Sequence, residues 1–303
     1  MSNMKKAVVT GGAGFVGSHV VDALIKEGFA VSVIDDLSGG KRENVHADAT
    51  LHVVDVRDSS AIAPIIAGSE FVFHLAALPR VQYSIDYPEE TNSVNVGGTL
   101  AVLKASKDAG VKRVIYAASS SAYGNQETLP LSEDAPPQPL SPYALQKYVS
   151  ELYCGIFTSV YGLSTVSLRF FNVYGPRLDP EGAYALVIGK FLKQKKEGTP
   201  LTITGDGTQT RDFTHVRDTV RGVLLAAKSE HVGKGEVINL GRGQEVSVNA
   251  LAELIGGSVV HIEPRLEPRH TRADITRAKE LLGWEPEVSL EDGIAELKQI
   301  FGV

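Results

Sequence analysis

The sequence predicts an α/β protein with a doubly wound parallel sheet and a smaller C-terminal α/β domain. Short, continuously apolar segments alternate with longer amphipathic segments over the first half of the chain. This alternation is typical of strands buried between two layers of helices. A glycine-rich turn joins the first apolar segment to the first amphipathic one, and the regular alternation stops after residue 171.

The elements follow from this alternation. Apolar, mostly β-branched runs predict strands at residues 6–10, 30–35, 50–56, 71–76, 113–119 and 165–171. Helical periodicity predicts helices at about 15–28, 58–67, 88–109 and 142–161. Gly28 and Gly110 stand where such helices end. We therefore expect residues 1–171 to form one domain with a parallel sheet.

The remaining residues, 172–303, are expected to form mostly a cap domain. They predict a helix near 183–196 and strands at 201–204 and 259–262. The segment at about 206–240, with a helix at 216–228 and a strand at 236–240, is expected to return to the main sheet.

Composition limits the class of protein. The 303 residues include 30 basic and 36 acidic side chains, for a formal charge of −6, and 43% are apolar. Because the charges are dispersed, we expect neither a disordered chain nor a nucleic-acid-binding protein. No apolar run is long enough to span a membrane. The single cysteine, Cys154, cannot form an internal disulfide or a zinc site, so we expect a cytoplasmic protein without a bound metal.

The glycine-rich turn predicts a dinucleotide site. Gly11 and Gly14 permit close backbone approach to a pyrophosphate at a helix start, and Gly17 permits close packing of that helix. A glycine pattern alone also fits an ordinary turn. Asp35, at the end of the second strand, supplies the acidic residue that a Rossmann site places on the adenosine ribose. With Asp36, it would repel the 2′-phosphate of NADP, so we predict NAD as the cofactor.

A tyrosine and a lysine share one helical face. Pro142 is suited to the first turn of a helix, which places Tyr143 and Lys147 one turn apart. A lysine cation beside a phenol lowers the pKa of the phenol, which is normally about 10, so that tyrosine can act as a general base. Taken alone, such a pair is more often a surface contact. Beside a dinucleotide site, the catalytic interpretation is favoured.

Polar residues also follow two other predicted strands. Asp55 is a candidate for binding the adenine amino group, although Asp is common in turns at strand ends. Ser119, Ser120 and Ser121 end the fifth strand, where the binding crevice of a parallel sheet lies. They can bind a substrate hydroxyl, and a helix cap is an equally good interpretation of any one of them.

These motifs together resemble the extended short-chain dehydrogenase/reductase family, and within it the nucleotide-sugar 4-epimerases, over essentially the whole chain. The resemblance rests on residues 10–17, 35–38, 74–77, 119–124, the pair Tyr143 and Lys147, 172–177 and 211–218. Residues 141–153 and 171–188 are most similar to UDP-N-acetylglucosamine 4-epimerases.

The resemblance implies reversible inversion at C4 of a UDP-hexose through a transient 4-keto sugar, with NAD bound throughout. Tyr143 would be the base, Lys147 its electrostatic partner and ribose anchor, and Ser119 the hydroxyl that aligns the sugar. UDP-glucose and UDP-galactose are the expected substrates, with the N-acetylated UDP-GlcNAc and UDP-GalNAc also expected. Ser120 and Ser121 replace the acidic pair of the family's dehydratases, which argues against dehydration.

The site residues implied in this way form two sets. We expect the cofactor to contact Gly11, Gly14, Phe15, Val16, Gly17, Asp35, Asp36, Leu37, Ser38, Gly39, Asp55, Val56, Leu75, Ala76, Ala77, Asn95, Ala117, Tyr143, Lys147, Phe170 and Val173. We expect the UDP-sugar to contact Ser119, Ser120, Ser121, Tyr143, Asn172, Val187, Arg211, Arg265 and Thr271.

Within the second set, Arg211 and Arg265 resemble the arginines that clamp the diphosphate. Arg269 and Arg272 fit a solvated surface role equally well. Thr271 falls where the family makes room for the 2-substituent of the sugar, and its small size implies that an N-acetyl group is accepted.

Other functions share many of these residues. A UDP-uronate 4-epimerase or a decarboxylase of the same family would use the same cofactor site. An NAD-sensing regulator is disfavoured because the catalytic serine, tyrosine and lysine are intact. The family is typically homodimeric, and the helices at 88–109 and 142–161 carry the apolar candidates for an interface, which are Val102, Ala105, Val149, Leu152 and Ile156.

Overall fold

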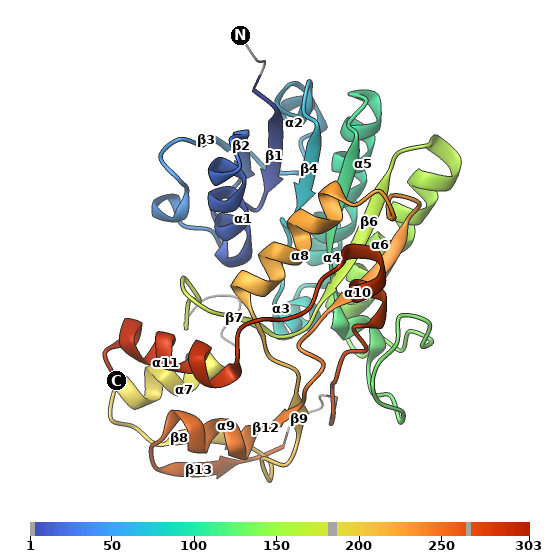
Figure 1. Ribbon diagram of the computed structural model, residues 1–303. Helices are drawn as coiled ribbons and strands as arrows, with labels where there is room; N and C mark the ends of the chain where they lie inside the picture. The colour runs from blue at the N-terminus through green and yellow to red at the C-terminus, as the bar shows by residue number, and fades with distance from the viewer. Residues whose placement is uncertain (1–3, 181–186, 265–267) are drawn as a thin grey trace.

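The computed structural model describes residues 4–180, 187–264 and 268–303. Within these residues, the largest sheet has seven parallel strands in the order β11-β6-β5-β4-β1-β2-β3. Figure 1 shows β3, β2, β1 and β4 of this sheet side by side. The strands are β1 (Lys6–Thr10), β2 (Ala30–Asp35), β3 (Thr50–Val53), β4 (Phe71–His74), β5 (Arg113–Ser119), β6 (Thr165–Phe170) and β11 (Glu236–Leu240). The predicted doubly wound α/β fold is therefore confirmed.

Helices cover both faces of this sheet. One face packs against α1 (Phe15–Lys26), α8 (Val216–Lys228) and α10 (Thr276–Leu282). The other face packs against α2 (Ser59–Ile66), α5 (Thr99–Asp108) and α6 (Pro142–Tyr161). Along β1, Ala7 and Val9 join the first core and Val8 joins the second. Side chains alternate between the faces of a strand, so a strand buried on both faces is apolar throughout.

Several elements differ from the sequence prediction in their ends. β3 ends at Val53 and β4 at His74, because the apolar residues that follow each strand belong to loops. The predicted helix at 88–109 consists of α4 (Pro88–Asn92), the π-helix η2 (Ser93–Gly98) and α5. A short helix, α3 (Val81–Asp86), precedes it and was not predicted.

Several elements after β6 form a further core. It contains residues of α7 (Val187–Lys196), α9 (Val248–Ile255), α11 (Leu290–Phe301) and β8 (Leu201–Thr204). β8 pairs in parallel with β13 (Val259–Ile262). Residues 183–186 of the helix predicted at 183–196 lie outside the described residues. Short pairs join β7 (Val173–Tyr174) to β10 (Thr214–His215) and β9 (Thr210–Arg211) to β12 (Val246–Ser247). The 3-10 turns are η1 (Arg42–Asn44) and η3 (Ser120–Tyr123).

Two of the predicted interface residues are buried in the core. Val102 and Ala105 lie on the side of α5 that packs against the sheet and α2, with 0% and 8% of their surface exposed. Their assignment to an interface is wrong, because both side chains are buried in the core. The sequence could not show this, since an apolar stripe on a helix can face either the core or a partner. Leu152 and Ile156 on α6 are half exposed, and Val149 is partly buried.

Among the helices in the described part of the chain, none has the length and apolar character needed to cross a membrane.

Candidate active site

The glycine-rich turn lies between β1 and α1. Gly11 has a φ of 71°, and a Cβ on it would lie 2.7 Å from the backbone nitrogen of Ala76. A Cβ on Gly17 would overlap the carbonyl oxygen of Gly11. Gly14 precedes α1, and among the described residues no side chain caps the first N–H groups of that helix. Since uncapped N–H groups at a helix start attract anions, this turn fits the diphosphate of a dinucleotide.

Asp35 ends β2 beside this turn. Its carboxylate accepts hydrogen bonds from the backbone N–H groups of Ala13 and Leu37, both at 2.9 Å. Burial raises the pKa of Asp35, and these two hydrogen bonds oppose the rise. The residue borders the main cleft, where its carboxylate can accept hydrogen bonds from ribose hydroxyls. The neighbouring Asp36 accepts hydrogen bonds from the backbone and the hydroxyl of Ser38.

A cleft of about 420 Å³ lies along the turn and the ends of the central strands. Its volume falls in the range of ~300–1,000 Å³ that is usual for small-molecule sites. The predicted cofactor residues that line it are Gly11, Gly14, Phe15, Val16, Gly17, Asp35, Asp36, Ser38, Gly39, Val56, Leu75, Ala76, Ala77, Ala117, Tyr143, Lys147 and Phe170. The lining residues that the sequence did not reveal are Gly40, Lys41, Glu43, Asn44, Val54, Leu78, Pro79, Val94, Ala118, Arg177, Leu178, Asp179 and Pro180.

Four predicted cofactor residues do not line this cleft. Asp55 accepts hydrogen bonds from the backbone and guanidinium of Arg57, and its pKa is lowered by that side chain. Asp55 therefore stabilises a turn after β3, which agrees with the turn interpretation given above for an Asp at a strand end. Asn95 is buried beneath the cleft, and Val173 is buried in β7. Leu37 has a φ of 63° and uses its N–H to bind Asp35.

Tyr143 and Lys147 both line the cleft from α6. The backbone N–H of Tyr143 donates to the hydroxyl of Ser84 at 3.0 Å, which ties the start of α6 to α3. The Lys147 ammonium donates to the carbonyl oxygen of Ala117 on β5 at 2.8 Å. Burial lowers the pKa of Lys147 to about 7. The two side chains are thus held one helical turn apart, facing the same cleft as the glycine turn.

The predicted serines follow the end of β5. Ser119 Oγ accepts hydrogen bonds from the backbone N–H of Ser121, at 3.2 Å, and from its hydroxyl, at 2.8 Å. With both lone pairs engaged in this way, the Ser119 hydroxyl keeps its proton for donation to a further acceptor. Ala117 and Ala118, which precede Ser119 on β5, line the cleft.

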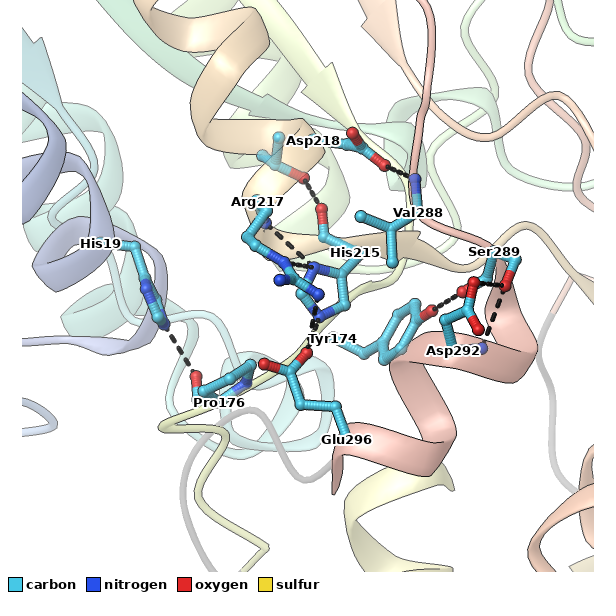
Figure 2. A network of polar contacts seen from close by, with 11 residues as sticks. His19, Tyr174, Pro176, His215, Arg217, Asp218, Val288, Ser289, Asp292 and Glu296 are labelled. Atoms are coloured by element: carbon cyan, nitrogen blue, oxygen red, sulfur yellow. Dashed lines mark hydrogen bonds and ion pairs between the residues drawn. The ribbon is translucent and has the colours of Figure 1, made fainter. Parts of the chain in front are cut away.

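A loop at residues 176–180 borders the cleft through residues 177–180. Its first two residues end the motif at 172–177, but none of the five was predicted as a site residue. His19 on α1 donates from Nε2 to the carbonyl oxygen of Pro176 at 2.8 Å (Figure 2). Because a carbonyl only accepts, this contact places the imidazole proton on Nε2. Burial lowers the pKa of His19.

Two ion pairs also anchor this loop to the first half of the chain. Arg177, whose φ is 65°, binds Asp22 on α1 at 2.7 Å. Asp179 binds Lys41, from the segment after β2, at 2.8 Å. Because Lys41 and Asp179 both line the cleft, their ion pair joins two segments of its lining, whereas the Arg177–Asp22 pair attaches the loop to α1. They arise from residues far apart in sequence, so no local pattern could reveal them.

Three predicted sugar-nucleotide residues gather around Asp212. Asn172 donates from Nδ2 to the carbonyl oxygen of Asp212 at 3.1 Å. Thr271 accepts from the N–H of Asp212 at 3.4 Å and is nearly buried. Arg211 precedes Asp212 at the end of β9, and its guanidinium donates to the carbonyl oxygen of Thr210 at 2.8 Å.

The other predicted residues of this set are more scattered. Val187 is the first residue of α7 and is partly buried. Arg265 lies outside the described residues. Arg269 is exposed and forms a 3.9 Å ion pair with Asp206, and Arg272 is partly buried.

The other residues of the segment at 211–218 connect α8 with α11 and with the residues that precede α11. His215 caps α8, because its Nδ1 accepts a hydrogen bond from the backbone N–H of Arg217 (Figure 2). The imidazole proton is therefore on Nε2. This atom lies 3.1 Å from the carboxylate of Glu296 on α11. Burial lowers the pKa of His215 to about 4. Asp218 accepts from the N–H of Val288 at 2.9 Å. None of these described residues lines the cleft, so their contacts stabilise the packing of α8 and α11.

Comparison with known proteins agrees with this geometry. Residues 7–241 match the model of the "NAD dependent epimerase/dehydratase family". A putative UDP-glucose 4-epimerase of Methanocaldococcus jannaschii is 39% identical over 297 residues, which cover 95% of each chain. The crystal structure of UDP-glucose 4-epimerase from Thermotoga maritima with UDP-glucose has a TM-score of 0.94 at 40% identity, covering 98% of each chain.

A Thermus thermophilus UDP-glucose 4-epimerase in complex with NAD has a TM-score of 0.90 at 33% identity, covering 98% of this chain and 99% of that one. The expected NAD cofactor, Rossmann fold and epimerase resemblance are confirmed by these matches. The chain belongs to the NAD dependent epimerase/dehydratase family.

Proposed function

We propose that this protein inverts the configuration at C4 of a UDP-hexose, with UDP-glucose and UDP-galactose as the primary pair. One observation carries the proposal: Tyr143 and Lys147 line the same cleft as the glycine turn and Asp35. The relatives named above as UDP-glucose 4-epimerases support it. In this proposal residues 1–171, with the returning segment 206–240, bind NAD, and the rest of 172–303 binds the sugar nucleotide.

Each catalytic side chain has a chemical task. Bound NAD supplies oxidation and reduction at the sugar carbon. The Tyr143 phenolate takes the proton of the 4-hydroxyl and later returns it, and the nearby Lys147 cation stabilises that phenolate. The Ser119 hydroxyl donates a hydrogen bond to the oxygen at C4 and keeps its proton, and its hydrogen bonds with Ser121 orient it for this role.

Substituting Tyr143 by Phe tests this mechanism. The purified protein is incubated with UDP-glucose, UDP-galactose and UDP-glucuronate, and the products and the bound NAD are identified. We expect C4 inversion of the hexoses by the parent, and loss of inversion with retention of NAD in Tyr143→Phe. Undiminished turnover by the variant would refute the assignment of the base. Inversion or loss of CO₂ with UDP-glucuronate alone would instead identify a uronate epimerase or decarboxylase.

Thr271 is proposed to set the tolerance for the sugar's 2-substituent. Its side chain is small and is held by the backbone of Asp212, next to Arg211. We propose that UDP-GlcNAc and UDP-GalNAc are substrates as well. The variant Thr271→Tyr should lose turnover of the N-acetylated pair and keep turnover of UDP-glucose. A parent protein inactive on UDP-GlcNAc would refute this part of the proposal.

We also propose a homodimer that forms through α6. Leu145, Leu152, Ile156 and Val160 are about half exposed or more, and their spacing places them on one side of the helix. An exposed apolar stripe of this kind is typical of a subunit interface. Light scattering should give twice the mass of the chain, and replacing Leu152 and Ile156 by Glu should give the monomer. A monomeric parent would contradict this proposal.

A further inference from the structure

Gln146 lies between the two proposed catalytic residues on α6. Its side chain is buried, with 4% of the residue exposed. Oε1 accepts a hydrogen bond from Asn95 Nδ2 at 2.8 Å. Nε2 donates to Thr91 Oγ1 at 3.0 Å and to the carbonyl oxygen of Pro88 at 3.4 Å. Both ends of this amide are therefore used to attach α6 to α4 and η2.

Asn95, the partner of Gln146, holds the loop that follows β4. Its Oδ1 accepts from the N–H of Leu78 at 2.7 Å, and its Nδ2 donates to the carbonyl oxygen of Leu78 at 3.1 Å. The two protons of Nδ2 are thus divided between Leu78 and Gln146. Residues 75–79 of this loop all line the cleft. The Gln146–Asn95 amide pair consequently connects the catalytic helix to another wall of the same cleft.

The backbone of Asn95 is fixed independently. Its carbonyl oxygen accepts from Thr99 Oγ1 at 2.6 Å and from Ser150 Oγ, on α6, at 3.0 Å. Thr99 Oγ1 lies 2.9 Å from His74 Nε2 and has given its proton to Asn95, so it accepts the proton of His74. Burial lowers the pKa of His74 to about 3, so this imidazole is neutral at physiological pH. Changing Gln146 therefore removes a side-chain contact from a backbone that other groups still hold.

We propose that Gln146 is a positioning residue that sets the loop at 75–79 relative to Tyr143 and Lys147. This inference rests on the proposed function, in which those two side chains act on the sugar. Catalysis requires the reacting groups to be aligned, and a displacement of ~1 Å can cost ~100-fold in rate. An amide suits this position because Asn95 offers a donor and Thr91 offers an acceptor, whereas a carboxylate only accepts.

The test compares two variants of Gln146 with a matched control. Gln146→Met keeps the length of the side chain and removes both hydrogen-bonding ends. We expect kcat to fall ~10- to 100-fold, with the KM for the UDP-sugar changed by less than ~2-fold, because all the proposed sugar-nucleotide residues except Tyr143 lie on other segments. Gln146→Glu keeps an acceptor for Asn95 and loses the donor to Thr91, so its kcat should be intermediate.

Gln194→Met is the control, because Gln194 makes comparable amide contacts with Thr202, at 2.9 and 3.1 Å, between α7 and β8. It should keep the kcat of the parent.

Each outcome decides the inference. A folded Gln146→Met protein with the kcat of the parent would overturn it, and so would a change confined to KM or to thermal stability. If Gln146→Met does not fold, Gln146→Glu decides: reduced kcat at constant KM supports the inference, and an unchanged kcat overturns it. A parent without turnover on any UDP-sugar would refute the proposed function, and the inference with it. An active parent with equally active variants would refute the inference alone.

Discussion

Removing one member of the Arg169–Glu151 ion pair should strongly destabilise the protein. Arg169 on β6 donates two hydrogen bonds to Glu151 on α6, at 2.9 and 2.6 Å, and the side chains are only 3% and 4% exposed. The guanidinium also lies 4.5 Å from the ring centre of Tyr123. Within the described residues, Nη1 of Arg169 has no hydrogen-bond partner. Glu151 is thus the residue that neutralises this buried cation.

The expected magnitude follows from that burial. Replacing Glu151 by Leu, or Arg169 by Met, leaves one charge buried and unpaired, which typically costs ~3–5 kcal/mol of unfolding free energy. For a chain of 303 residues, this corresponds to a decrease in Tm of ~5–8 °C. The double variant buries no charge and should lose much less, on the order of 1 kcal/mol, because apolar pairs can replace buried ion pairs at little cost.

Urea unfolding followed by circular dichroism measures these differences as a double-mutant cycle. The control is Asp108→Asn, which breaks the exposed pair between Lys104 and Asp108 and should leave the unfolding free energy close to that of the parent. The reasoning would be refuted if each single variant of the buried pair lost under ~1 kcal/mol, or if the double variant lost the sum of the two.

Three further predictions concern the cleft and its support. Lys41→Gln removes the ion pair with Asp179 across the cleft and should speed NAD release by ~2- to 5-fold. Added salt should speed release from the parent and not from this variant, and equal rates under all conditions would contradict the expectation. Gly17→Ala places a Cβ against the carbonyl oxygen of Gly11, so the purified protein should lack NAD, and a full complement of NAD would disprove the steric argument. The pKa of His74 is about 3 in the folded protein against 6.5 for an ordinary histidine, so only the unfolded chain gains a proton as pH falls below 6.5. Stability should therefore decrease with falling pH in that range, and the imidazole NMR signals of His74 should stay constant between pH ~8 and ~5.

The parts of the site with a local signature could be predicted. The glycine turn is specified by residues that are close in sequence, and Asp35 follows at the end of the next strand. Tyr143 and Lys147 are one helical turn apart, so helical geometry alone places them on one face. The ends of β3 and β4 could not be predicted, because the apolar run continues past each strand into residues that line the cleft. Apolar residues in a buried strand and apolar residues in the wall of a cleft form the same kind of run in the sequence, so the run does not show where the strand ends.

Features that depend on distant contacts were not predictable. Residues 177–180 line the cleft, and the loop that contains them is held by His19, Asp22 and Lys41. These three residues lie near the N-terminus, far from the loop in sequence. Asn95 was expected to contact the cofactor, and the structure instead shows its amide bound to Leu78 and Gln146. The sequence resemblance pointed to Asn95 as a site residue, but it could not show which groups the Asn95 side-chain amide binds.

The position of β11 has a consequence for how the protein is made. This strand pairs with β6 at the edge of the central sheet, yet the chain reaches it only after passing through part of the C-terminal half. During synthesis, β6 therefore remains an open edge until residue 240 has emerged, and open edges pair readily with other chains. A fragment that ends at residue 171 would keep that edge permanently. We expect such a fragment to aggregate, so the two halves cannot be produced or exchanged as separate modules.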